Sequence, residues 1–324
     1  MMFEAMLSLL DAARPSVWVA VAAVRGSVPR AEDAGMLVTA DQVIGTIGGG
    51  HLELKAIELA REWLRLGKAG ATQRHYPLGP ALGQCCGGAV DLLFRPVTEA
   101  ERPWVEALAR AEREGGELTL RTDTERNAGH TTLVSDGSPV AMATRYRFQP
   151  WHVWVFGAGH VGKALVQVLA TLPTRITWVD SRDAEFPAHL PHNVRMLLSD
   201  FPADEVDEIP AGADVLVLTH SHALDLEIVT RLLRRDDLAY AGLIGSETKA
   251  SLFRRRLAER GVDASGLVCP IGAAVSGPKD RQSDKHPGAI AVNVAADLLA
   301  RRRVASCVKS SLNSSLNSSV RAPA

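Results

Sequence analysis

In the first half of the chain, some apolar stretches have the pattern of strands and others have the spacing of helices. The β-branched run at residues 16–24 predicts a strand, and residues 35–50 predict two short strands around a polar turn at Ala40–Asp41. Residues 51–67 carry apolar side chains three and four positions apart and end in glycine, which predicts a helix. A further strand is expected at 89–97. This mixture indicates an α+β unit, preceded by an amphipathic helix at the start of the chain.

Residues 98–150 are expected to complete this first domain. Residues 101–116 predict a helix with Pro103 near its first turn and a glycine stop. Residues 117–123 and 130–146 have the composition of strands joined by a turn.

From Trp151 onward the pattern becomes regular, and continuous apolar strands alternate with helices. This alternation is typical of a parallel sheet covered by helices on both faces. We therefore predict an α/β chain with an N-terminal α+β domain at 1–148 and a Rossmann-like doubly wound domain at 149–303. The serine- and asparagine-rich residues 304–324 predict a disordered tail.

Composition agrees with two globular domains in 324 residues, of which 46% are hydrophobic. A net charge of −1 argues against general attraction to nucleic acid or to anionic membranes. No apolar run approaches the roughly 20 residues that span a bilayer, and the acidic first residues do not resemble a signal peptide. Four cysteines are too few for a disulfide framework, so we expect a reducing cytoplasm.

A glycine fingerprint follows the first strand of the second half. Gly157, Gly159 and Gly162 form G-x-G-x-x-G between a strand and a helix, a context that favours a bound phosphate over a vestigial loop. Asp180 ends the next strand, where an acid accepts from a ribose hydroxyl. Arg182 would instead favour a 2′-phosphate, so NAD and NADP both stay open.

Histidines gather around the same predicted edge of the sheet. His160 lies inside the glycine loop, either as a solvent-exposed residue or as a ligand contact. His220, His222 and Asp225 form H-x-H-x-x-D at the carboxyl end of a strand. These residue types suit a divalent metal, but the spacing is weakly specific. We therefore favour a role in lining a pocket over direct metal binding, and Asp225 could simply cap the next helix.

The first domain offers two candidate anion sites. Arg25 and Arg30 flank a turn and could clamp a phosphate, or could simply be solvated. Three glycines stand directly ahead of a helix: Gly48, Gly49 and Gly50. They predict either an anion nest or a tight turn that needs positive φ. Glu53 could then be an acid favoured by the helix dipole.

Two adjacent cysteines, Cys85 and Cys86, lie in a glycine-rich segment. Neighbouring thiols on a loop are poor packing elements, whereas a thiolate is a nucleophile and a soft metal ligand, so we favour a functional role. No second cysteine pair supports a structural zinc site. Cys269 is expected in the core, and Cys307 to be incidental.

Together and in this order, these motifs resemble the XdhC/CoxI family of xanthine dehydrogenase accessory proteins. The residues that carry the resemblance are "RGSVPR", "GTIGGGHLE" and "LGPALGQCCGG", followed by "FGAGHVGKAL", "VDSR", "THSHALD" and "GLIGSETK". The resemblance extends to about residue 300. The chain departs from the family in a longer, more charged stretch at 273–292, and in Ser221, where the family often has aspartate.

The resemblance implies a cytoplasmic chaperone that binds molybdenum cofactor (molybdopterin), aids its sulfuration and inserts it into xanthine dehydrogenase of purine catabolism. The implied partners are the molybdenum subunit of the apo-enzyme, a cysteine desulfurase and a molybdenum cofactor biosynthesis protein. The resemblance also implies that the family's cysteine loop falls on Cys85 and Cys86. Of the two, Cys85 is our choice for a molybdenum contact.

Two other functions stay open on the residues alone. The glycine fingerprint and Asp180 suit an NAD(P)-dependent oxidoreductase, although no proton donor with a substrate clamp can be identified. Metal-dependent hydrolysis at His220 and His222 is a more distant alternative. The oligomeric state is open too, with a homodimer as one option.

Overall fold

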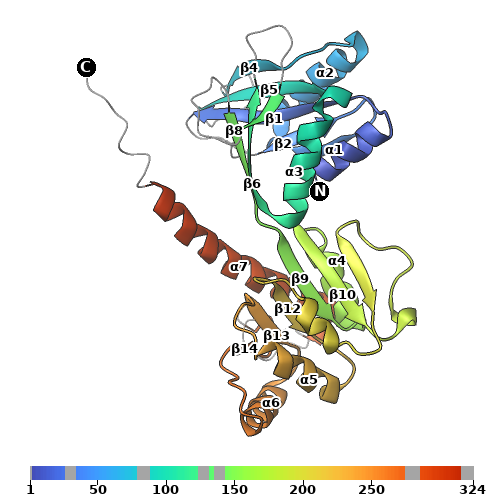
Figure 1. Ribbon diagram of the computed structural model, residues 1–324, viewed down its shortest axis with the longest axis vertical. Coiled ribbons are helices and arrows are strands. Elements are labelled where there is room, and N and C mark those ends of the chain that lie inside the picture. Colours follow the sequence, from blue (N-terminus) through green and yellow to red (C-terminus); the bar gives the residue numbers. More distant parts are fainter. Residues whose placement is uncertain are drawn as a thin grey trace, which may run out of the picture. The chain divides into compact units, whose positions relative to one another are not determined.

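The computed structural model describes residues 2–25, 34–78, 88–122, 131–134, 143–273 and 285–314, without the side chains of residues 121, 131–145 and 303–314. The chain divides into two compact units, Met1–Pro150 and Trp151–Ala324, close to the predicted boundary (Figure 1). We call them the first and second units.

An antiparallel five-stranded sheet forms the centre of the first unit, in the order β3-β2-β1-β5-β4. Its strands are β1 (Ser16–Arg25), β2 (Gly35–Val38), β3 (Val43–Thr46), β4 (Thr72–Pro77) and β5 (Ala89–Val97). The apolar pattern leaves β4 unpredicted, because this edge strand is mostly polar and exposed. Alternating side chains give the sheet two apolar faces.

Helices cover both faces of this sheet. Helix α2 (Gly50–Leu66) packs on one face, through residues that include Leu52 and Trp63. The other face is covered by α1 (Met2–Asp11), α3 (Arg102–Glu114) and side chains of a second small sheet. That sheet has the order β7-β6-β8, with β6 at Gly116–Thr122, β7 at Thr131–Val134 and β8 at Ala143–Phe148. A short 3₁₀ helix, η2 (Glu99–Glu101), precedes α3.

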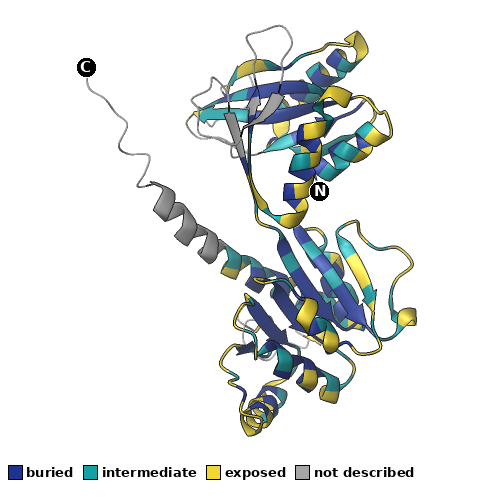
Figure 2. Cartoon of the chain, in the orientation of Figure 1, coloured by how far each residue is buried: buried dark blue, intermediate teal, exposed yellow. Residues whose placement is uncertain are grey.

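The second unit is a six-stranded parallel sheet in the order β11-β10-β9-β12-β13-β14. This is the doubly wound order of the Rossmann fold, so the predicted fold class is confirmed. The strands are β9 (Trp151–Phe156), β10 (Thr174–Asp180), β11 (Val194–Leu198), β12 (Asp214–Val217), β13 (Tyr240–Leu243) and β14 (Leu267–Val268). The central strands β9, β12 and β13 are almost entirely buried, as Figure 2 shows.

Two helix layers enclose this sheet. Helices α4 (His160–Leu169) and α7 (Pro287–Ser314) pack on one face, and α5 (His222–Leu232) and α6 (Glu247–Glu259) on the other. Short 3₁₀ helices lie at Asp183–Glu185 (η3) and Asp204–Glu208 (η4). Helix α7 continues to Ser314, so the structure differs from the predicted disorder at residues 304–314. No glycine or proline interrupts the chain between residues 289 and 314, so nothing in the backbone chemistry ends the helix earlier.

Candidate functional site

The glycine loop of the second unit joins β9 to α4. A Cβ on Gly157 would lie 2.2 Å from the carbonyl oxygen of Leu218, and one on Gly162 would lie 2.1 Å from that of Gly157. These two glycines are therefore required by close packing of the chain itself. At Gly159, the residue that precedes α4, an added Cβ would meet nothing within 4 Å. Open space thus lies beside the N-terminus of α4, where a phosphate is favoured.

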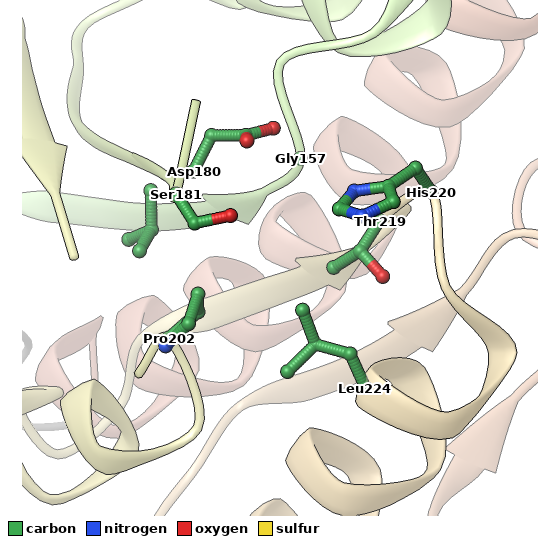
Figure 3. A pocket seen from close by; sticks show the side chains of 8 residues that line it. Gly157, Asp180, Ser181, Pro202, Thr219, His220 and Leu224 are labelled. Carbon is green, nitrogen blue, oxygen red and sulfur yellow. The ribbon is translucent and has the colours of Figure 1, made fainter. Parts of the chain in front are cut away.

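A pocket lies next to this loop, between the carboxyl ends of β10 and β12. It is a shallow depression rather than an enclosed cavity, and its roughly 180 Å³ of space includes open solvent. In Figure 3, Pro202 and Leu224 lie on one side of the space, Asp180 lies opposite them, and His220 is beside Thr219 at the rim. The remaining lining residues are Gly157, Val179 and Ser181. The strand order reverses at β9, so this is the switch point where open α/β sheets bind ligands.

Asp180 is already engaged by its own chain. Its Oδ1 accepts from the backbone N–H of Arg182 at 3.0 Å and from Nε of Arg182 at 2.9 Å. Its Oδ2 accepts from the N–H of Ala158 at 2.6 Å and from a terminal guanidinium nitrogen of Arg182 at 2.9 Å. Burial tends to raise the pKa of Asp180, but these hydrogen bonds hold it below its usual value. The two residues predicted as alternative ligand contacts are therefore paired with each other.

The predicted H-x-H-x-x-D group does not converge on one point. His220 lines the pocket and is exposed, whereas His222 begins α5 and is also exposed. Asp225 is fully buried, and its Oδ1 accepts from the N–H and the hydroxyl of Thr219. Helix α5 is capped by Ser221, whose hydroxyl accepts from the N–H of Leu224.

No group of three His, Cys, Asp or Glu side chains that could hold a metal occurs within the described parts of the chain. His160 is the first residue of α4 and is exposed, as expected for a residue of the loop rim.

Sequence reasoning missed Lys249, on the first turn of α6. Its ammonium lies 2.6 Å from Oδ2 of Asp225 and donates to the carbonyl of Ile244 at 2.9 Å. A lysine inside the "GSETK" motif was the available signal, but its partner lies 24 residues away and is set by the strand order.

In the first unit, strand pairing brings the flanks of three motifs to one end of the sheet. Arg25, exposed at the end of β1, is paired with Ala89 at the start of β5. Leu78 donates its N–H to the carbonyl of Gly88 at 2.7 Å, which joins the two ends of segment 79–87. Gly35 at the start of β2 is paired with Thr46 at the end of β3, two residues before the glycines at 48–50. Gly35 is also paired with Ala20, so this flank lies nearer the middle of β1 than Arg25 does. Arg30, Cys85 and Cys86 lie outside the described residues.

The three glycines before α2 form a tight turn. Gly48, Gly49 and Gly50 have φ values of 124°, 79° and 71°, a region that favours glycine. Oε2 of Glu53 accepts from the N–H of Gly49 at 3.0 Å and from that of Ile47 at 2.9 Å. The predicted anion nest is thus filled by a carboxylate of the chain itself, and a ligand would have to displace it.

A histidine–aspartate pair, also missed from the sequence, lies near the same end of the sheet. Nδ1 of His75 on β4 is 2.7 Å from Oδ1 of Asp91 on β5. Asp91 is paired with Ala23, two residues before Arg25. Paired and alternate residues share a face of a sheet, so Arg25, Asp91 and His75 lie on the same face.

Two family models match this chain. One, described as the XdhC Rossmann domain, matches residues 153–298, and the other, described as the XdhC and CoxI family, matches residues 9–77. The chain belongs to the XdhC and CoxI family. The predicted family is therefore confirmed. The matched regions include Arg25 and the glycine turn before α2 in the first unit, and the glycine loop and Asp180 in the second.

Known relatives extend this result. The uncharacterized protein YqeB of Escherichia coli (strain K12) is 28% identical over 284 residues, which cover 85% of this chain. The match covers 41% of that protein, so the chain spans less than half the length of this relative. A crystal structure described as a xanthine dehydrogenase from Bacillus halodurans superposes with a TM-score of 0.73 at 22% identity. It covers 94% of this chain and 96% of its own, which shows that the fold is shared.

Within the described residues, none of the helices is both long and apolar enough to cross a membrane.

Proposed function

We propose that this protein is a cytoplasmic accessory protein that binds molybdenum cofactor, supports its sulfuration and inserts it into apo-xanthine dehydrogenase. Its partners would be the molybdenum subunit of that enzyme, a cysteine desulfurase and a molybdenum cofactor biosynthesis protein. The proposal is for binding and delivery of a cofactor rather than for turnover of a substrate.

The gathering of motif flanks at one end of the first unit's sheet is the observation that carries this proposal. Segment 79–87, which contains both adjacent cysteines, begins and ends beside the strand end that carries Arg25. The cofactor is an anionic pterin whose molybdenum is bound by sulfur. An exposed guanidinium suits its phosphate, and a thiol suits its metal.

The described residues differ in how well they fit such a cofactor. Arg25 is exposed at the strand end and fits an anionic group. The N–H groups of Gly48 and Gly49 do not, because they already donate to Thr46 and Glu53. We therefore assign the phosphate contact to Arg25 and the molybdenum contact to Cys85, with Cys86 as the alternative.

The test is to purify the full chain from cells that make the cofactor, oxidise it, and measure the fluorescent pterin derivative per protein. We expect the wild type to carry cofactor, and Cys85→Ala or Cys86→Ala to retain much less. Cys269→Ala is the matched control, because it removes a buried thiol of the second unit. If both loop variants retain as much cofactor as the wild type, the thiol contact is refuted. A wild type that carries no pterin would refute the proposal as a whole.

The glycine loop also favours the alternative of an NAD(P)-dependent oxidoreductase. Turnover of NAD(P)H with small substrates by protein that holds no pterin would support that alternative.

A further inference from the structure

One edge of the second unit's sheet is an apolar strand. Strand β11 stands at the end of the strand order, beside β10, and its register with β10 runs without a bulge. Its sequence VRMLL holds a single charged residue. Two of its large apolar side chains, those of Met196 and Leu198, are 39% and 48% exposed. Figure 2 shows half-buried and exposed residues along this strand, whereas β9 and β12 are largely buried.

The backbone of β11 directs hydrogen-bonding groups away from the sheet. Ser199, which follows the strand, donates its N–H to the carbonyl of Asp180 at the end of β10, so Ser199 faces β10. In a parallel ladder every second residue bonds to the same neighbour, so Met196 and Leu198 point their N–H and C=O groups away from β10. Within the described parts of the chain, no strand lies on that side to pair with them.

Sheet edges are normally protected against pairing with another chain. Proteins shorten the edge strand, interrupt it with a bulge, or place lysine, proline and other polar residues on it. The opposite edge strand of this sheet, β14, has only two residues, and the edge strand β4 of the first unit is mostly polar and ends at Pro77. Strand β11 has five residues and none of these protections. An apolar edge of this kind favours pairing with a strand of another chain.

The edge of β11 is complementary to a second copy of itself. If two copies run antiparallel about Met196, this residue faces the partner's Met196, and Val194 faces the partner's Leu198. Alternate residues share a face of the sheet, so these pairs bring apolar side chains together. The same register, extended by two residues, brings exposed His192 opposite the partner's Asp200, which is also exposed. The edge therefore matches itself in apolar character at its centre and in charge at both ends.

We propose that β11 pairs antiparallel with β11 of a second copy of this chain, so that the two parallel sheets join across a two-fold axis at Met196. The outward N–H and C=O of Met196 then meet those of the partner's Met196. The N–H of Leu198 meets the C=O of the partner's Val194, while Val194 keeps its own N–H on the carbonyl of Pro191 at 3.0 Å. The inference gives a homodimer a defined surface on the second unit, and it is independent of cofactor delivery by the first.

Sedimentation velocity of the full chain, measured at several protein concentrations, tests for this dimer. A ladder of five residues lies at the small end of protein interfaces, so we expect a reversible dimer with a Kd of about 1–100 μM. A chain that stays monomeric at a concentration of about 200 μM would overturn the proposal.

Substitutions at Met196 test the surface. Met196→Lys places like charges directly opposite each other and should raise the Kd of the dimer about tenfold or more. Met196→Pro removes the outward N–H without removing a bond to β10, and should also weaken the dimer. Val292→Lys is the matched control, because it adds the same charge at an exposed apolar position of α7 and should leave the Kd unchanged. Melting temperatures close to that of the wild type verify that the variants are folded. An unchanged Kd in both folded Met196 variants would refute the surface.

A cross-link tests the register. Opposite residues that exchange both backbone bonds have Cα atoms about 5.5 Å apart, which is within the range that a disulfide can bridge. Met196→Cys should therefore form a disulfide with the partner's position 196 when the dimer is oxidised, and peptide mass spectrometry separates this link from any made by the native cysteines. Val292→Cys is the control and should give no such link. A dimer in which the Met196→Cys variant forms no link at this position would refute the register.

Discussion

Lys249 and Asp225 form a buried ion pair between α6 and α5, with Nζ 2.6 Å from Oδ2 and side chains that are 11% and 0% exposed. The other oxygen of Asp225 accepts from the N–H and hydroxyl of Thr219, a residue of the pocket. Through these contacts the ion pair holds the turn between β12 and α5 in place. It links a family motif on α6 to the edge of the candidate ligand site.

Removing one partner of this pair should destabilise the second unit strongly. Lys249→Met leaves the carboxylate of Asp225 buried without its cation, and such changes cost about 3–5 kcal/mol of unfolding free energy. Urea unfolding followed by tryptophan fluorescence measures the loss. Lys163→Met is the control, because its pair with Glu185 has side chains that are 41% and 34% exposed and should contribute much less. Equal losses in the two variants would contradict a special role for the buried pair.

Alanine should lower the free energy of unfolding more at Gly162 than at Gly159. In Gly162→Ala, the new Cβ would meet the carbonyl oxygen of Gly157 at 2.1 Å, so backbone must shift, at a cost of about 1–3 kcal/mol. Gly159→Ala meets no atom and should cost less than about 1 kcal/mol as a change of N-cap residue. Thermal and urea unfolding of both variants provide the comparison. A Gly159 variant less stable than the Gly162 variant would contradict this assignment.

The fold could be predicted because its signals are local. Continuous apolar strands, helical spacing and the glycine turn after β9 each lie within a few residues, and the parallel sheet follows from their alternation. The end of α7 differs from the expectation for the same reason. The serine-rich composition of residues 304–314 suggested disorder, although no helix-breaking residue is present there.

The contacts within the site could not be predicted in the same way. Asp180 and Arg182 are two residues apart, but only the turn after β10 brings the guanidinium onto the carboxylate. Asp225 and Lys249 meet because β12 and β13 are neighbours in the sheet. Residue types indicate what each group can bind, whereas the folded chain decides which groups have already bound one another.

Cys269 should remain unreactive in the folded protein. The thiol is 7% exposed, and burial raises its pKa to about 11, so very little thiolate is present at pH 8. Iodoacetamide labelling at pH 8, mapped by peptide mass spectrometry, should leave Cys269 unmodified in native protein and modify it in urea. Equal labelling under both conditions would contradict the burial of this thiol. The same maps report the other cysteines separately.

Glu53 should make the first unit less stable in acid. Burial tends to raise the pKa of Glu53, but hydrogen bonds from Thr46, Gly49 and Ile47 lower it below the ordinary value of 4.5. A carboxylate with a lowered pKa in the folded state stabilises that state above pH 4.5, and the stabilisation is lost as pH falls through the folded-state pKa. Glu53→Gln should therefore lose about 1 kcal/mol at pH 7 and progressively less below pH 4.5. Unfolding midpoints measured from pH 7 to pH 3.5 check this against Glu62→Gln, which removes an exposed carboxylate from the same helix. Parallel pH profiles for the two variants would show that net charge, rather than the filled glycine turn, accounts for the effect.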